Sequence, residues 1–117
     1  MTDISIGKNA RMTVLPLAQE QLQEFFRNIL GCEVTKKEEG YDIIHLFDGN
    51  MGVKYRDNAL SETDFMKATW MEFTTENPDK MKQKILNFGI KEIEYEDKAH
   101  FYFQAPGGQV FRLASKS

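Results

Sequence analysis

Residues 101–113, FYFQAPGGQVFRL, contain two runs rich in aromatic and aliphatic residues, joined by the segment Ala105-Pro106-Gly107-Gly108. Proline at the second position of a turn fixes φ, and glycine at the third position takes the positive φ that a type II turn requires. The flanking aromatic and β-branched residues suit a pleated, half-buried surface. The stretch therefore predicts a β-hairpin.

The two faces of this hairpin differ because side chains alternate along a strand. The apolar face carries Phe101, Phe103, Phe111 and Leu113. The other face is mixed and polar, and carries His100, Tyr102, Gln104, Val110 and Arg112. We expect helices to cover the apolar face and the polar face to line a cleft.

Composition is that of an ordinary soluble globular chain: 117 residues, 41% hydrophobic and 28% charged. The net charge of -3 and the lack of a Lys/Arg stripe argue against nucleic acid as a partner. No run is long and apolar enough for a membrane span, and the first residues lack the apolar centre of a signal peptide. The single Cys32 excludes an internal disulfide, so we expect a reducing, cytoplasmic environment.

Two segments have helical periodicity, and the rest of the pattern is strand-like. The predicted helices are residues 18–30, ended by Gly31, and residues 78–88, with Asn77 as N-cap and Gly89 after the last turn. The predicted strands are residues 11–17, 32–37, 41–47, 51–55, 69–75, 90–96 and the two arms of the hairpin. Residues 56–65 are polar and unpatterned, which is typical of a linker.

The order of elements before the linker repeats after it, about 58 residues further along the chain. Each copy reads β-α-β-β-β, with module one at about residues 8–57 and module two at about residues 66–115. The pattern predicts an α+β fold in which 1–117 form one domain of two such modules, with a curled mixed sheet around a cleft.

The LPL segment before the first helix, the LGCEV segment after it, and FYFQAPGGQVFRL at the end give the chain its resemblance to a known family. It resembles the glyoxalase / bleomycin-resistance / extradiol-dioxygenase superfamily, also called vicinal oxygen chelate. The resemblance covers nearly the whole chain. It implies paired β-α-β-β-β modules around a cleft, often completed by a second subunit, so we expect a homodimer.

Enzymes of that superfamily usually hold a divalent metal with histidines or glutamates from the first and last strand of each module. Matched position by position, these places fall on Met12, Trp70 and Arg112, and on a fourth position near Val53, Lys54 or Tyr55. A thioether, an indole and a protonated guanidinium do not form a usual metal site. We therefore expect no metal and no cofactor.

Strand parity predicts a set of cleft residues: Met12, Val14, His45, Phe47, Trp70, Glu72, His100, Tyr102, Gln104, Val110 and Arg112. The same residues could instead fill a closed barrel. We expect ligand contacts from Met12, Phe47, Trp70, Glu72, Tyr102, Gln104 and Arg112. Candidates for acid-base catalysis are His45, His100 and Glu72, which could also hold a displaced metal.

Glu72 and Arg112 are an informative pair because an inward-facing charged pair needs mutual compensation or a ligand. The first functional hypothesis is a glyoxalase- or bleomycin-resistance-like protein that binds a small anionic or aromatic ligand without the usual metal. The alternative is a lyase, isomerase or dioxygenase-like enzyme of the same superfamily, with a displaced metal or none. A non-catalytic protein-interaction domain is the third hypothesis.

Overall fold

The computed structural model describes residues 2–116 of the chain. The first half contains β1 (Asn9–Val14), η1 (Pro16–Ala18), α1 (Gln19–Glu24), η2 (Phe25–Ile29), β2 (Glu33–Glu38), β3 (Tyr41–His45) and β4 (Asn50–Tyr55). The second half contains α2 (Glu62–Ala68), β5 (Trp70–Thr75), α3 (Pro78–Phe88), β6 (Glu92–Ile93), β7 (Phe101–Gln104) and β8 (Val110–Ser115). No helix within residues 2–116 is long and apolar enough to cross a membrane.

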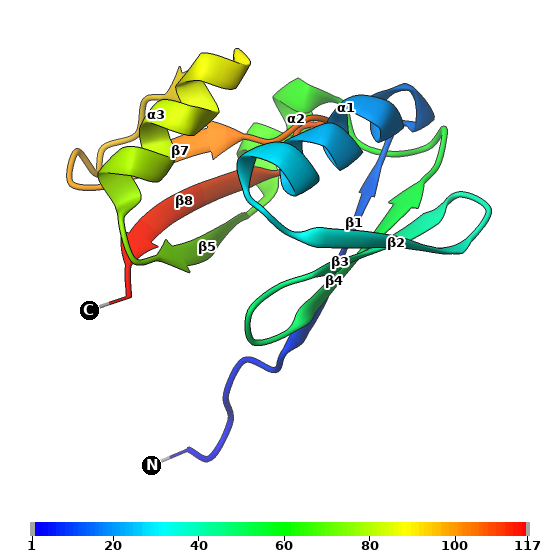
Figure 1. Ribbon diagram of the computed structural model, residues 1–117, viewed down its shortest axis with the longest axis horizontal. Coiled ribbons are helices and arrows are strands. Elements are labelled where there is room, and N and C mark those ends of the chain that lie inside the picture. The colour runs from blue at the N-terminus through cyan, green and yellow to red at the C-terminus, as the bar shows by residue number, and fades with distance from the viewer. Residues whose placement is uncertain (1, 117) are drawn as a thin grey trace.

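The predicted α+β fold of two β-α-β-β-β modules is confirmed. Each module forms its own mixed four-stranded sheet, with the order β1-β4-β3-β2 in the first and β5-β8-β7-β6 in the second. The first and last strands of each module pair in parallel, and the remaining pairs are antiparallel. The two sheets lie side by side and do not close into one barrel, and α1 and α3 lie over them on the same side (Figure 1).

The predicted hairpin turn has the expected geometry. The Gly108 amide donates to the Ala105 carbonyl at 2.9 Å, which closes a four-residue turn with Pro106 in its second position. Gly107, in the third position, has φ +96°, as a type II turn requires. A Cβ at Gly107 would lie 2.8 Å from Val14, so the turn also packs against β1 of the other module.

Helix α3 has the predicted bounds, because its caps are encoded locally. The Asn77 side chain accepts a hydrogen bond from the Lys80 amide, Pro78 occupies the first turn, and Gly89 ends the helix with φ +110°. The first predicted helix is built in three pieces, η1, α1 and the π-helical η2. Gly31 follows with φ +73°.

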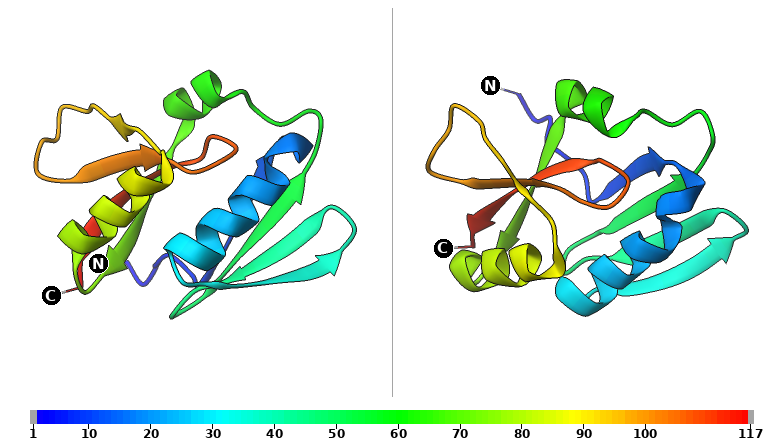
Figure 2. Two further views of the ribbon diagram at one scale, coloured as in Figure 1. Left: turned by 45° about the horizontal axis from the view of Figure 1, so that its top comes forward. Right: turned by 90° about the horizontal axis from the view of Figure 1, so that it is seen from above.

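The core is shared between the modules. Phe25 and Phe26 from the first module are fully buried, and their rings meet aromatic rings of the second. Phe26 lies 6.3 Å from both Phe73 and Phe111, centroid to centroid, and Phe25 lies 5.9 Å from Phe103. The aromatic face of the hairpin therefore packs against a helix of the other module as well as against α3. Figure 2 shows the first helix and α3 next to each other in two views.

Each sheet has a helix face, directed towards α1 and α3, and a far face directed away from them. In the second sheet the predicted parity is correct, because Met71, Phe73, Phe111 and Leu113 belong to the core cluster and Trp70 does not. In the first sheet the predicted parity of β1 is wrong. Met12 and Val14 are buried on the helix face, where they pair with Val53 and Tyr55 of β4.

The physical reason is the alternation within β1 itself. Apolar Met12 and Val14 gain more from burial under α1 than the polar residues between them. Arg11 and Thr13 consequently occupy the far face, beside Gly52 and Lys54 of β4.

The segment expected to be a linker contains α2. Ser61 caps this helix by accepting a hydrogen bond from the Asp64 amide, and Phe65 is buried. The Gln104 side chain donates to the Glu62 carbonyl at 2.7 Å, and the Tyr95 hydroxyl lies 3.5 Å from the Met66 carbonyl. These contacts hold α2 against the far face of the second sheet.

Two predicted strands are shorter than expected. The strand predicted for residues 41–47 ends at His45, and Phe47 lies in the following turn with 93% of its surface exposed. The strand predicted for residues 90–96 is reduced to Glu92–Ile93. A loop therefore occupies residues 94–100, and it returns over the far face of the second sheet.

A buried polar cluster connects α1 to the helix face of the first sheet. Asp42, 1% exposed, accepts hydrogen bonds from the Gln23 amide at 2.8 Å and the Tyr55 hydroxyl at 2.9 Å. Burial raises the pKa of the Tyr55 phenol above its ordinary value, and the hydrogen bond to Asp42 adds to this rise. Tyr55 therefore remains a hydrogen-bond donor at neutral pH.

Candidate functional site

The far face of the second sheet brings together residues from β5, β7 and β8. Glu72 pairs with Arg112 across the parallel β5–β8 ladder, and Arg112 pairs with Tyr102 across the antiparallel β7–β8 ladder. Paired residues of neighbouring strands project to the same side. Sequence parity and strand register thus give one row of side chains, Glu72, Arg112 and Tyr102.

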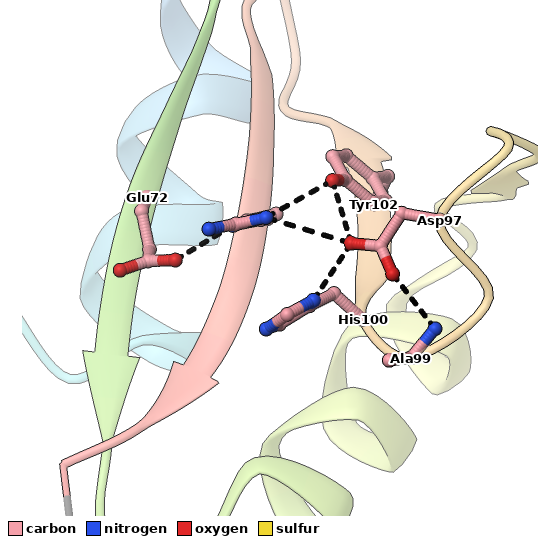
Figure 3. A network of polar contacts seen from close by, with 6 residues as sticks. Glu72, Asp97, Ala99, His100 and Tyr102 are labelled. Carbon is pink, nitrogen blue, oxygen red and sulfur yellow. Dashed lines mark hydrogen bonds and ion pairs between the residues drawn. The ribbon is translucent and has the colours of Figure 1, made fainter.

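Arg112 is the centre of this row. Its Nε donates to Glu72 Oε2 at 2.6 Å, and its Nη1 lies 3.3 Å from the Tyr102 hydroxyl and 3.5 Å from Asp97 Oδ2 (Figure 3). The predicted pairing of Arg112 with Glu72 is confirmed. Hydrogen bonds to Tyr102 and then to Glu72 raise the pKa of Arg112, so the guanidinium stays charged.

Asp97 reaches the site from the loop 94–100 and was not expected from the sequence. Its Oδ1 accepts from the Ala99 amide at 2.9 Å, and its Oδ2 accepts from the Tyr102 hydroxyl at 2.9 Å and lies 2.7 Å from His100 Nδ1. The bond from the Ala99 amide, followed by that from His100, lowers the pKa of Asp97 to about 2. The carboxylate is therefore ionised throughout the neutral range.

Trp70 forms the aromatic part of the site. The carbon at the centre of the Arg112 guanidinium lies 4.4 Å from the indole centroid, a cation–π arrangement. The Tyr102 ring meets the indole edge to face at 5.7 Å between centroids, and the Tyr95 ring lies tilted against Tyr102 at 4.5 Å. The Tyr102 ring is therefore buried, while Trp70 keeps 42% of its surface exposed.

The exposed Trp70 indole can bind a flat molecule, but the carboxylates around Arg112 oppose the binding of an anion. Arg112 carries one positive charge, and the carboxylates of Glu72 and Asp97 both bond to it. An incoming anion would have to displace one of these carboxylates or approach both. A planar neutral or cationic group meets no such barrier at the exposed indole.

Other residues predicted for the site are either distant from it, as His45 and Phe47 are, or next to it but already enclosed, as Val110 and Gln104 are. His45 lies on the far face of the first sheet, with Nε2 2.9 Å from the Thr35 hydroxyl. Phe47 lies near the C-terminal end of the chain, beneath the Lys116 ammonium at 4.1 Å. Val110 is fully buried, and the Gln104 amide is engaged by the carbonyls of Glu62 and Gly108.

Two residues of the site were missed: Tyr95 falls within the strand predicted for residues 90–96, and Asp97 follows it directly. Asp97 is followed at the third position by His100, and a short polar run between strands is typical of an Asp-centred turn. That signal could have identified the loop. Nothing in the sequence indicated that the loop would return to Arg112.

The residues matched to metal-ligand positions do not fit a metal ion. Met12 is buried in the core, the Trp70 indole has no lone pair to offer, and the Arg112 guanidinium is held by two carboxylates. Within residues 2–116 no three His, Cys, Asp or Glu side chains are grouped so that they could hold a metal. His45 lies on the first sheet, whereas Glu72 lies on the second and His100 in the loop before β7, so the suggested displaced ligand set is not assembled.

This fold belongs to the class of paired β-α-β-β-β proteins known as the glyoxalase or vicinal oxygen chelate fold. No protein-family model matches the sequence, and no curated protein matches it. Solved structures do match over nearly the full length of both chains, at identities that show the fold alone.

Three of these structures illustrate the range. A Bacillus anthracis protein assigned to the glyoxalase family has a TM-score of 0.77 at 17% identity, covering 100% of both chains. The fosfomycin resistance protein FosX of Listeria monocytogenes, complexed with Mn(II) and sulfate, has a TM-score of 0.73 at 16% identity, covering 97% of this chain and 92% of that one. TnmS3, an antibiotic-binding protein of Streptomyces, has a TM-score of 0.70 at 14% identity, covering 100% of both chains.

Proposed function

We propose that this protein binds a small planar organic molecule on the far face of its second sheet. The observation that carries the proposal is Trp70, a half-exposed indole held in place by Arg112 at 4.4 Å and by Tyr102 at 5.7 Å. A large aromatic side chain that is both exposed and fixed gives a binding surface at low cost in side-chain entropy. The antibiotic-binding protein TnmS3 has the same fold, which is consistent with this proposal.

The polar residues set the preferred charge of the ligand. Arg112 shares its guanidinium between Glu72 and Asp97, so two carboxylates already bond to the one guanidinium that lies over the indole. Its Nη2 donates no hydrogen bond to residues 2–116 and can still donate to a ligand carbonyl or hydroxyl. The ligand expected here is an aromatic compound that is neutral or cationic and carries a hydrogen-bond acceptor.

The test uses the emission of Trp70, which is the only tryptophan of the chain. We would titrate the protein with three matched bicyclic probes: 2-naphthalenemethanol, N-methylquinolinium and 2-naphthoate. The neutral and cationic probes should change the emission at lower concentrations than the anionic one. Trp70→Ala, measured by calorimetry, should weaken binding of the preferred probe at least tenfold, and Phe47→Ala, which removes another exposed ring, should leave it unchanged. Equal binding of all three probes to Trp70→Ala and to the native protein would refute the site.

A second candidate function, acid-base catalysis, rests on the His100–Asp97 pair. Asp97 holds His100 through Nδ1 at 2.7 Å and is itself fixed by the Ala99 amide, which leaves the imidazole Nε2 without a hydrogen bond to residues 2–116. A histidine oriented by a carboxylate is suited to move a proton at its other nitrogen.

Two measurements separate this candidate from simple binding. His100→Gln should abolish conversion of the bound compound, detected by mass spectrometry, while its binding at Trp70 persists. Elemental analysis of the purified protein should be done in parallel, and we expect no stoichiometric transition metal. Recovery of the unchanged compound after long incubation with the native protein would exclude the catalytic candidate for that compound.

A further inference from the structure

A cleft of about 570 Å³ lies between the modules, apart from the Trp70 surface. It is bounded by β1, the end of β4, the segment before α2, α2 itself and the residues just before β5 and β8. Its lining residues are Arg11, Met12, Thr13, Lys54, Arg56, Asn58, Ala59, Leu60, Phe65, Ala68, Thr69 and Gln109. We call it the inter-module cleft.

The charges in this cleft are all of one sign. Arg11, Lys54 and Arg56 line it, and none of its lining residues is Asp or Glu, although the chain as a whole has a net charge of -3. Within residues 2–116 neither Arg11 nor Arg56 makes an ion pair or a side-chain hydrogen bond. The Lys54 ammonium lies 4.9 Å above the Tyr41 ring and has no carboxylate partner among the described residues.

Strand register is the reason that these cations share one cleft. Burial of Met12 and Val14 turns Arg11 and Thr13 to the far face, and Thr13 pairs directly with Lys54. The Arg56 amide then donates to the Val14 carbonyl at 2.9 Å, so Arg56 follows β4 along the same edge. The fold therefore gathers three like charges that repel one another until an anion compensates them.

We propose that the inter-module cleft is a binding site for a small organic oxyanion, a carboxylate or a phosphate. The guanidinium groups of Arg11 and Arg56 can each donate two parallel hydrogen bonds to such a group, and Lys54 adds a third charge. Thr13, Asn58 and Thr69 supply neutral polar groups around them. The volume suits a metabolite-sized molecule. This site is independent of the proposed binding at Trp70, where Arg112 is already compensated by carboxylates.

The experiment is a titration of isotopically labelled protein with pyrophosphate and, separately, with tricarballylate, followed by amide chemical shifts at 20 mM salt. Either probe should change the amide chemical shifts of residues 11–13 and 54–58, and these changes should saturate. The probe that binds more tightly identifies phosphate or carboxylate as the preferred group. Arg11→Gln and Arg56→Gln should each weaken binding of that probe at least tenfold, and affinity should fall as salt is raised. Lys84→Gln, which removes an exposed cation on α3 outside the cleft, is the matched control and should bind normally.

Arg11 and Arg56 are exposed, so their replacement should leave the fold intact, which the dispersion of the amide spectrum verifies. Arg11→Lys keeps the charge and removes the planar fork, and it should bind with intermediate affinity. Two outcomes would overturn the inference. One is the absence of saturable shifts with both probes at millimolar concentration. The other is a loss of affinity in Lys84→Gln as large as that in Arg11→Gln, which would indicate attraction to net charge alone.

Discussion

Replacing Phe26 by alanine tests whether the two modules depend on one core. The Phe26 ring is fully buried and lies within 6.3 Å of Phe25, Phe73 and Phe111, the last two belonging to the other module. Truncating a buried phenylalanine typically costs about 3–5 kcal/mol, and we expect about 4 kcal/mol because three aromatic neighbours lose a partner. With an m value of about 2 kcal/mol/M, this lowers the urea midpoint by roughly 2 M.

The assay is urea unfolding followed by two signals. Trp70 emission reports on the second module alone, and far-ultraviolet circular dichroism reports on both. In Phe26→Ala both transitions should move together, because the lost contacts belong to both sheets. Phe47→Ala is the control, since that ring is 93% exposed and its loss should change stability by less than about 0.5 kcal/mol. A loss below about 1 kcal/mol in Phe26→Ala, or a Trp70 transition that stays in place while the dichroism moves, would refute the shared core.

Three further predictions concern Asp97, the glycines and assembly. The folded pKa of Asp97, about 2, lies below its ordinary value, so its stabilising contribution is complete above about pH 4 and is lost as pH falls through about 2. The free energy of unfolding of Asp97→Asn should therefore depend less on pH across this range, and identical pH profiles for the variant and the native protein would contradict the hydrogen-bond network. Gly107→Ala should lower the free energy of unfolding by about 1–2 kcal/mol through backbone strain, and further because the added Cβ displaces Val14; Gly89→Ala, with φ +110° and no atom within 4 Å of the added Cβ, should show the strain alone. Equal midpoints of the two variants in thermal unfolding would contradict the packing of the turn on β1. The chain should form a homodimer, since each sheet ends in exposed edge strands, and light scattering that returns a monomer at all practical concentrations would contradict this expectation.

The parts of the fold that could be predicted are those that neighbouring residues decide. Asn77, Pro78 and Gly89 set the bounds of α3 through its own backbone, and Pro106 and Gly107 define the hairpin turn. The alternation of apolar and polar residues in β5 and β8 assigned the Glu72–Arg112 pair to one face, because register follows from which side is buried.

The parts that could not be predicted depend on contacts distant in the sequence. The family resemblance matched Met12 to a position in the cleft, but Met12 is buried in the core under α1. The helix α2 has few apolar residues, and it is held by bonds from Gln104 and Tyr95 of the second module. Asp97 reaches Arg112 only because the strand predicted for residues 90–96 is cut short.

The buried Asp42 has a consequence for how the first sheet finds its alignment. A shift of β3 by one residue would exchange its two faces and turn the carboxylate away from Gln23 and Tyr55. Asp42 would then leave two polar groups unpaired under α1, and an apolar neighbour such as Ile43 would take its place there. We therefore expect Asp42→Leu to retain much of the stability and to lose alignment, visible as a second set of β3 amide signals. The main effect of the cluster is therefore to select one strand register, and its contribution to the free energy of folding is secondary.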